Sequence, residues 1–173
     1  MAGNIYEREL RKILSGEKAY IEKITKSYPV EQRELYLKIV ERPFLVLRAA
    51  GSFGIDIVAI RHYFSFPIEV KSSHYNVFRF TMSNGKAQDQ ILNHIRDTGR
   101  AGLFPLYAYR IKNVHGDPWR LFVPPGLNVR GNMMLVYRLL PKIEITNSGN
   151  YLMRWDQGFP LHKFIDYLTK KYL

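Results

Sequence analysis

The order of hydrophobic and polar positions predicts helices and strands along the chain. Apolar residues recur at helical spacing in four segments: 4–26, 30–40, 86–98 and 160–172. Shorter apolar runs predict strands at about 44–49, 54–60, 66–71, 104–111 and 119–123. A weaker apolar stretch covers 133–140, before an expected turn at 147–149. This order predicts an α/β (α+β) fold with a mixed central β-sheet flanked by helices.

Residues that start or interrupt helices refine the N-terminal part of this pattern. Asn4 is the expected N-cap of the first helix, with Glu7 three residues later in a loose capping box. Gly16 interrupts the helical pattern, so two shorter helices are an alternative to one long helix. Pro29 precedes the second helix and Pro43 follows it, as expected for a residue that is disfavoured inside helices.

Two carboxylates interrupt strands that are otherwise apolar. Asp56 lies in GIDIVAI, residues 54–60, where both faces of the predicted strand are apolar. Glu69 lies in FPIEVKSS, residues 66–73, where apolar and charged positions alternate. Burying a charge is costly unless a partner compensates it. We therefore expect each of these carboxylates to have a compensating partner.

A hairpin between these strands would bring the two carboxylates together. If the chain turns between His62 and Tyr63, Asp56 lies opposite Glu69, with their Cβ atoms about 5 Å apart. Carboxylates this close repel, and one of them keeps a proton unless a cation lies between them. Lys71 follows two residues after Glu69, on the same face. One ammonium does not satisfy two carboxylates, whereas a divalent metal ion does.

The first helix adds a third inward carboxylate. Glu7 shares a helix face with Leu10 and Leu14, whereas Glu9 is expected to point to solvent. Three carboxylates and a lysine form a hard-oxygen site, which suits Mg²⁺ or, as a substitute, Mn²⁺. Such a metal ion activates water for phosphodiester hydrolysis. The structural alternative is a salt bridge of Lys71 with one of the strand carboxylates, because an Asp…Glu-X-Lys pattern also arises by chance.

The net charge of the chain indicates the kind of molecule that it binds. The chain has 26 Lys and Arg against 15 Asp and Glu, a net charge of +11, and residues 48–123 carry 10 basic and 5 acidic side chains. Two of those five acids are the strand carboxylates. This excess favours a polyanion, above all nucleic acid, as the partner. A solubilising surface charge is the alternative.

The length of the chain and its lack of cysteine further limit the class of protein to which it can belong. A chain of 173 residues that is 46% hydrophobic predicts one globular domain. The absence of cysteine excludes disulfides, a thiolate zinc site and a cysteine nucleophile. No apolar run approaches the ~18 residues of a membrane span, and the first residues do not resemble a signal peptide. We therefore expect a cytoplasmic protein with no membrane partner.

Three motifs resemble those of the archaeal Holliday junction resolvases, a family of the PD-(D/E)XK nuclease superfamily. They are ERELRKIL at 7–14, VLRAAGSFGIDIVAI at 46–60 and IEVKSS at 68–73. The resemblance implies a restriction-endonuclease-like fold, Mg²⁺-dependent cleavage of four-way DNA junctions and a homodimer. It also implies a nucleoid-associated location, with recombination proteins as further partners.

The resemblance also implies roles for individual residues. The implied metal ligands are Glu7, Asp56 and Glu69. Lys71 would be the catalytic lysine, and Ser52 would lie in the catalytic loop near the scissile phosphate. The implied DNA-binding residues are Arg8, Arg48 and Arg110, of which Arg110 has the weakest match to the family.

Two parts of the chain depart from the family pattern. Residues 1–123 are interpreted as a nuclease core with an insertion at about 15–43, and residues 124–173 as a C-terminal extension packed on it. Two other functions stay open: another endonuclease of the superfamily, restriction-like or repair, and a non-catalytic junction-binding protein. Three aromatic residues, Tyr63, Phe64 and Phe66, either stack on exposed bases or pack in the protein or at a dimer interface.

Overall fold

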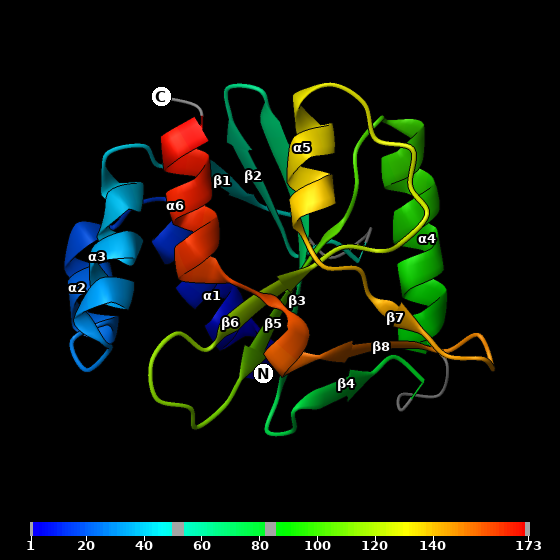
Figure 1. Ribbon diagram of the computed structural model, residues 1–173, viewed down its shortest axis with the longest axis horizontal. Coiled ribbons are helices and arrows are strands. Elements are labelled where there is room, and N and C mark those ends of the chain that lie inside the picture. The colour runs from blue at the N-terminus through cyan, green and yellow to red at the C-terminus, as the bar shows by residue number, and fades with distance from the viewer. Residues whose placement is uncertain (1, 50–53, 82–85, 172–173) are drawn as a thin grey trace.

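The computed structural model describes residues 2–49, 54–81 and 86–171, arranged around a six-stranded central sheet (Figure 1). In spatial order the strands are β1 (Leu45–Arg48), β2 (Ile57–Arg61), β3 (Phe64–Ser73), β5 (Leu106–Ile111), β6 (Trp119–Phe122) and β9 (Phe159–Pro160). Strands β3 and β5 are parallel, and the other neighbours are antiparallel. The predicted mixed central sheet is therefore confirmed.

Helices cover both faces of this sheet. The core on one face includes α1 (Ala2–Leu14), α2 (Lys18–Ile24), α3 (Val30–Leu37) with the short 3₁₀ helix η1 (Lys38–Val40), α5 (Asn132–Leu139) and α6 (Leu161–Lys171). The other face packs against α4 (Lys86–Arg100) and residues of a smaller sheet. Figure 1 shows α3 beside α6 on one side of the molecule and α4 on the opposite side. Within the described ranges, no helix combines the length and apolar character that crossing a membrane requires.

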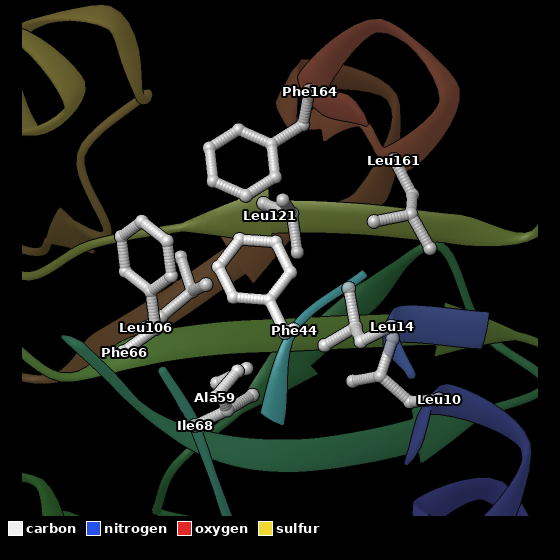
Figure 2. A pocket seen from close by; sticks show the side chains of 10 residues that line it. All are labelled: Leu10, Leu14, Phe44, Ala59, Phe66, Ile68, Leu106, Leu121, Leu161 and Phe164. Atoms are coloured by element: carbon white, nitrogen blue, oxygen red, sulfur yellow. The ribbon is translucent and has the colours of Figure 1, made fainter. Parts of the chain in front are cut away.

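The larger core forms because alternate residues of β3 face α1 and α6. Phe64, Phe66 and Ile68 are all 1% exposed, which confirms the packing alternative for the two phenylalanines. Phe66 contacts the rings of Phe44 and Phe164 at centroid distances of 5.9 and 5.7 Å. Figure 2 shows these side chains around a small, entirely apolar cavity between the strands, α1 and α6. The opposite face of β3 is thereby left to its polar residues.

The N-terminal helices differ from the sequence prediction in one detail. Helix α1 begins at Ala2, so Asn4 lies inside it and the predicted N-cap is wrong. The break at Gly16 is confirmed, with α1 ending at Leu14 and α2 beginning at Lys18. Gly16 has φ of +72°, and a Cβ there would lie 3.0 Å from Cβ of Pro43. A larger side chain would be strained at this turn.

Four short strands are absent from the sequence prediction. A second sheet has the order β4 (Val77–Arg79), β8 (Tyr151–Arg154) and β7 (Glu144–Ile145). Strand β8 is followed by the 3₁₀ helix η2 (Trp155–Gln157), and β9 adds the last strand to the central sheet. Segments of two to four residues are too short to show a periodic pattern. The division at 123/124 stays a prediction, although β8 and β9 pair with strands on its other side.

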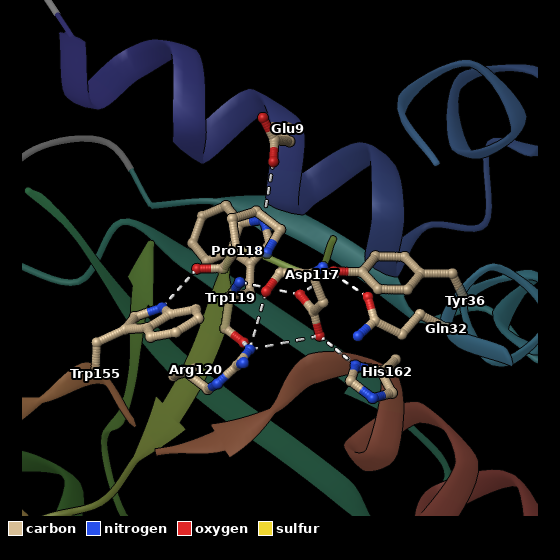
Figure 3. A network of polar contacts seen from close by, with 9 residues as sticks. All are labelled: Glu9, Gln32, Tyr36, Asp117, Pro118, Trp119, Arg120, Trp155 and His162. Atoms are coloured by element: carbon tan, nitrogen blue, oxygen red, sulfur yellow. Dashed lines mark hydrogen bonds and ion pairs between the residues drawn. The ribbon is translucent and has the colours of Figure 1, made fainter. Parts of the chain in front are cut away.

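A buried carboxylate, Asp117, joins α3 and α6 to the central sheet (Figure 3). It accepts hydrogen bonds from the Tyr36 hydroxyl of α3 and the backbone N–H of Trp119 in β6. His162 of α6 contacts the second carboxylate oxygen, with its backbone N at 3.0 Å and Nδ1 at 2.6 Å. The pKa of Tyr36 is well above its usual value, because the hydroxyl is buried and Asp117 lies beside it. Asp117 therefore holds two helices and one strand in place.

The position of Glu9 contradicts the expectation that it faces solvent. Its carboxylate is buried and accepts 2.9 Å hydrogen bonds from Trp119 Nε1 and Arg110 Nε. The helical pattern placed Glu9 away from the apolar face, but β5 and β6 supply two donors on that side. Glu9 thus anchors α1 to the sheet.

We expect Asp117→Ala to lower the free energy of unfolding by about 3–5 kcal/mol, because several buried donors lose their acceptor together. Tyr36→Phe should cost only about 1–2 kcal/mol, because it removes one of those donors and keeps the ring. Urea denaturation measures both values. Equal costs for the two variants would contradict a central role for Asp117.

Candidate functional site

The β2–β3 hairpin brings the two carboxylates, Asp56 and Glu69, close together. Its turn consists of His62 and Tyr63, as predicted, and its register pairs Ile57 with Ile68. Asp56 directly precedes these paired residues, and its backbone N–H donates to the carbonyl of Ile68, the partner of Ile57, at 3.1 Å. The predicted register is therefore confirmed for 57–61 on 64–68, but it does not extend to a pair of Asp56 and Glu69.

Glu69 is the buried member of the pair. It is 4% exposed, and its Oε1 lies 2.9 Å from the Lys71 ammonium. Its other oxygen, Oε2, is buried without a hydrogen-bond donor. Burial raises the pKa of Glu69 to about 8; Lys71 opposes the rise, and Asp56 adds to it. One ammonium thus leaves this carboxyl group uncompensated.

Asp56 links Glu69 to the N-terminal helix. Its Oδ2 accepts a 2.7 Å hydrogen bond from the backbone N–H of Val70. Glu7 of α1 comes close enough for a side-chain hydrogen bond with Asp56, and burial together with Asp56 raises the pKa of Glu7, while Arg48 lowers it. The predicted inward orientation of Glu7 is confirmed. Three carboxylates thus form a row from α1 to β3, with Asp56 in the middle.

This row has the donor set of a divalent metal ion site. Within the row, the buried Oε2 of Glu69 has no hydrogen-bond partner, and the neighbouring Asp56 adds to the raised pKa of Glu69. In residues 2–49, 54–81 and 86–171, no three or more acidic, histidine or cysteine side chains form a preformed metal cage. Asp56 and Glu69 therefore fit a hard cation, with Glu7 adjoining them, provided that the side chains close around it.

An open cleft of about 620 Å³ lies in front of the row. It is lined by Glu7, Arg48, Ala49, Gly54, Ile55, Asp56 and Gln90. Its volume falls within the usual range for ligand sites. Glu69 and Lys71 do not line it, so Asp56 and Gln90 connect them to its surface.

Gln90 of α4 is a site residue that the sequence analysis missed. Its Oε1 lies 3.3 Å from Lys71 Nζ, and its Nε2 lies 3.4 Å from the carbonyl oxygen of Gly54. Gly54 has φ of +71°, and a Cβ there would lie 2.5 Å from Gln90 Nε2, so this contact requires glycine. The available signal was weak: Gln90 is a polar residue directly before buried Ile91 on an amphipathic helix.

The three predicted DNA-binding arginines have different surroundings. The Arg48 side chain is 59% exposed, with its guanidinium 3.9 Å from Glu7 at the cleft. Arg8 is exposed on α1. Arg110 is engaged inside the protein, bound to Glu9 and lying 4.4 Å from the Tyr6 ring. Its DNA contact stays a prediction, and its observed contacts are structural. Ser52 lies outside the described residues.

Comparison with known proteins does not decide the function of this site. No protein-family model matches the chain, and no curated protein matches it. Among solved structures, Hjc, a Holliday junction resolvase of the archaeal hyperthermophile Archaeoglobus fulgidus, is similar, with a TM-score of 0.47 and 17% identity. The match covers 78% of this chain and 92% of that one. A similarity of this size leaves function to be argued from the site.

We expect Glu69→Gln to stabilise the protein in EDTA at pH 8. The folded carboxyl group has a pKa of about 8 against an ordinary value of 4.5, so the folded state holds a proton that the unfolded chain loses. The wild-type free energy of unfolding therefore falls as pH rises from about 4.5 to 8. Between pH 5 and pH 8 the wild type should lose about 1–3 kcal/mol of its free energy of unfolding through this group. The Glu69→Gln variant should not show this loss, because glutamine does not titrate.

Urea denaturation at pH 5 and pH 8 tests this expectation. Glu34→Gln, at an exposed position of α3, is the matched control and should follow the wild type. Added Mg²⁺ should stabilise the wild type at pH 8 and leave Glu69→Gln unchanged. A Glu69→Gln variant less stable than the wild type at pH 8 would show that the carboxylate has an adequate partner.

Proposed function

We propose that this chain is a metal-dependent endodeoxyribonuclease that cuts four-way DNA junctions. The observation that carries the proposal is the close pair of Asp56 and Glu69, in which one buried Glu69 oxygen has no hydrogen-bond donor. A structural salt bridge accounts for the contact of Lys71 with Glu69 but not for the two further carboxylates beside it.

The chemistry follows from the positions of the side chains. Asp56 and Glu69 would hold a divalent ion, Mg²⁺ or Mn²⁺, which lowers the pKa of a bound water and polarises a phosphoryl oxygen. Lys71 places a positive charge where negative charge develops during attack on phosphorus. Gln90 Oε1 accepts a second hydrogen bond from the Lys71 ammonium and helps to orient it. Arg48 is exposed at the cleft and available to a DNA phosphate.

Two features support DNA junctions as the substrate. The net charge of +11 favours a polyanion, and its phosphate contacts should weaken steeply as salt rises. The motifs at 7–14, 46–60 and 68–73 resemble those of the archaeal junction resolvases. For such a substrate, recognition would be by shape and phosphate contacts rather than by base sequence.

Paired cuts at a two-fold junction require two sites, so we propose a homodimer. Its best supported interface is β1, the terminal strand of the central sheet. This strand exposes Leu45 and Leu47, at 63% and 50%, on the same face. Exposed apolar residues on an edge strand suit pairing with a second copy of the strand.

We expect the wild type to make paired, symmetric nicks in an end-labelled four-way junction in Mg²⁺, and none in EDTA or in linear duplex. Asp56→Asn should bind the junction with near wild-type affinity and cut at least ~100-fold more slowly, because the central carboxylate of the row is lost. Asp156→Asn, at an exposed site on η2, is the control and should cut normally.

The possible outcomes separate the competing functions. Cleavage by Asp56→Asn would overturn the metal assignment. Sequence-dependent cutting of linear duplex would point to a restriction-like or repair endonuclease. Junction binding with no cleavage in any divalent ion would point to a non-catalytic binding protein.

We expect Leu47→Lys to be a monomer, because a charge on an edge strand blocks strand pairing. The wild type should sediment at twice the chain mass of 20.3 kDa. Leu135→Lys, on the exposed face of α5, should remain dimeric. Sedimentation of the wild type as a single chain at micromolar concentration would contradict the dimer.

A further inference from the structure

Tyr75 is an exposed aromatic residue in the turn that follows the strand of Glu69 and Lys71. It is 75% exposed, more than any other large apolar or aromatic residue that the structure describes. The turn lies between β3 and β4, beyond the C-terminal end of β3. Aromatic side chains usually bury their rings, so one this exposed has no role in the packing of this chain.

The backbone of this turn is fixed even though the ring is exposed. The N–H of Tyr75 donates to Ser73 Oγ at 2.9 Å, and its carbonyl accepts a hydrogen bond from the Tyr109 hydroxyl. The carbonyl of Asn76 accepts from the N–H of Trp155 at 2.8 Å. Each of these contacts uses backbone atoms of the turn. The ring therefore projects from a defined position, which lowers the entropic cost of binding a flat partner.

A chain of contacts connects this turn to the proposed catalytic lysine. Lys71 Nζ lies 5.8 Å from the centroid of the Phe78 ring, in β4. Phe78 packs edge-on against Tyr109 at a centroid distance of 5.9 Å, and Tyr109 holds the Tyr75 carbonyl. Tyr75 thus lies on the same structural unit as Lys71, four residues further along the chain.

A basic side chain lies between the turn and α1. The N–H of Lys112 donates to the carbonyl of Ser73 at 3.0 Å, next to the turn. Its ammonium lies 5.7 Å from the ring of Tyr6, the residue before Glu7. Lys112 therefore bridges the Tyr75 turn and the helix that contributes to the cleft. A DNA strand leaving the cleft along this side would meet a positive charge and then a flat ring.

We propose that Tyr75 is a stacking platform for an unstacked nucleobase of the DNA held in the cleft, with Lys112 on the adjoining phosphate. This inference rests on the proposed function and names a binding contact for it. A base at the centre of a four-way junction has a free π-face, which a duplex interior does not offer. Aromatic residues stack on such faces without regard to base identity.

Binding in EDTA tests the inference without cleavage. Tyr75→Ala should bind a four-way junction roughly 5- to 100-fold more weakly than the wild type, the usual range for losing one stacked base. Tyr75→Phe keeps the ring and should bind like the wild type. Both variants should keep the wild-type melting temperature, because the turn is held through backbone atoms.

Val30→Ala is the matched control. Val30 is 72% exposed at the start of α3, away from the cleft and from the Tyr75 turn. It should bind with wild-type affinity. A second experiment uses junctions that carry 5-iodouracil at each central position. Irradiation of the complex, followed by digestion of the protein, should yield a cross-link in the peptide that contains Tyr75.

The other possible results test the stacking role of Tyr75 and the nuclease function separately. Wild-type affinity for Tyr75→Ala, or an equal loss for Val30→Ala, would overturn the stacking role. An equal loss for Tyr75→Ala on junction and on linear duplex would do so too, because a duplex interior offers no free base. Failure of the wild type to cut any DNA in Mg²⁺ would overturn the nuclease and leave the binding difference intact.

Discussion

The site depends on one constraint: a buried carboxyl group, Glu69, lies close to another carboxylate, Asp56, at the base of the β2–β3 hairpin. Burial and repulsion make this pair unfavourable unless positive charge is supplied, and Lys71 supplies only part of it. The surrounding elements hold the pair in place. Helix α1 adds Glu7, and α4 adds Gln90 to hold the lysine. Charge imbalance of this kind is typical of sites whose function requires a cation.

The two faces of the central sheet have different roles. One face carries the large apolar core between the strands, α1 and α6, closed at one end by the Asp117 network. The stability that this core provides offsets the cost of keeping Glu69 and Asp56 close together on the other face. The smaller sheet lies on the second face, where β4 brings Phe78 close to Lys71 of β3. The extension therefore helps to shape the surroundings of Lys71, because β8 holds β4.

Arginine and glutamate positions show the limit of assigning roles by residue type. Arg48 and Arg110 have the same charge, yet one is exposed at the cleft and the other is bound to Glu9. Glu7 and Glu9 are two residues apart on α1, yet Glu7 belongs to the carboxylate row and Glu9 holds the helix to the sheet. Neighbours supplied by other strands decide these roles, and they are far away in sequence.

The sequence by itself determined the mixed sheet, the longer helices, the hairpin register and the proximity of Asp56 to Glu69, because periodicity and turn length are local properties. It missed β4, β7, β8 and β9, which are too short to carry a period, and it misplaced the start of α1. Only the tertiary structure decided that Glu9 is buried, that Gln90 reaches Lys71 and that Tyr75 stands exposed on a fixed turn. Each of these depends on residues brought together by folding, and no local pattern encodes such contacts.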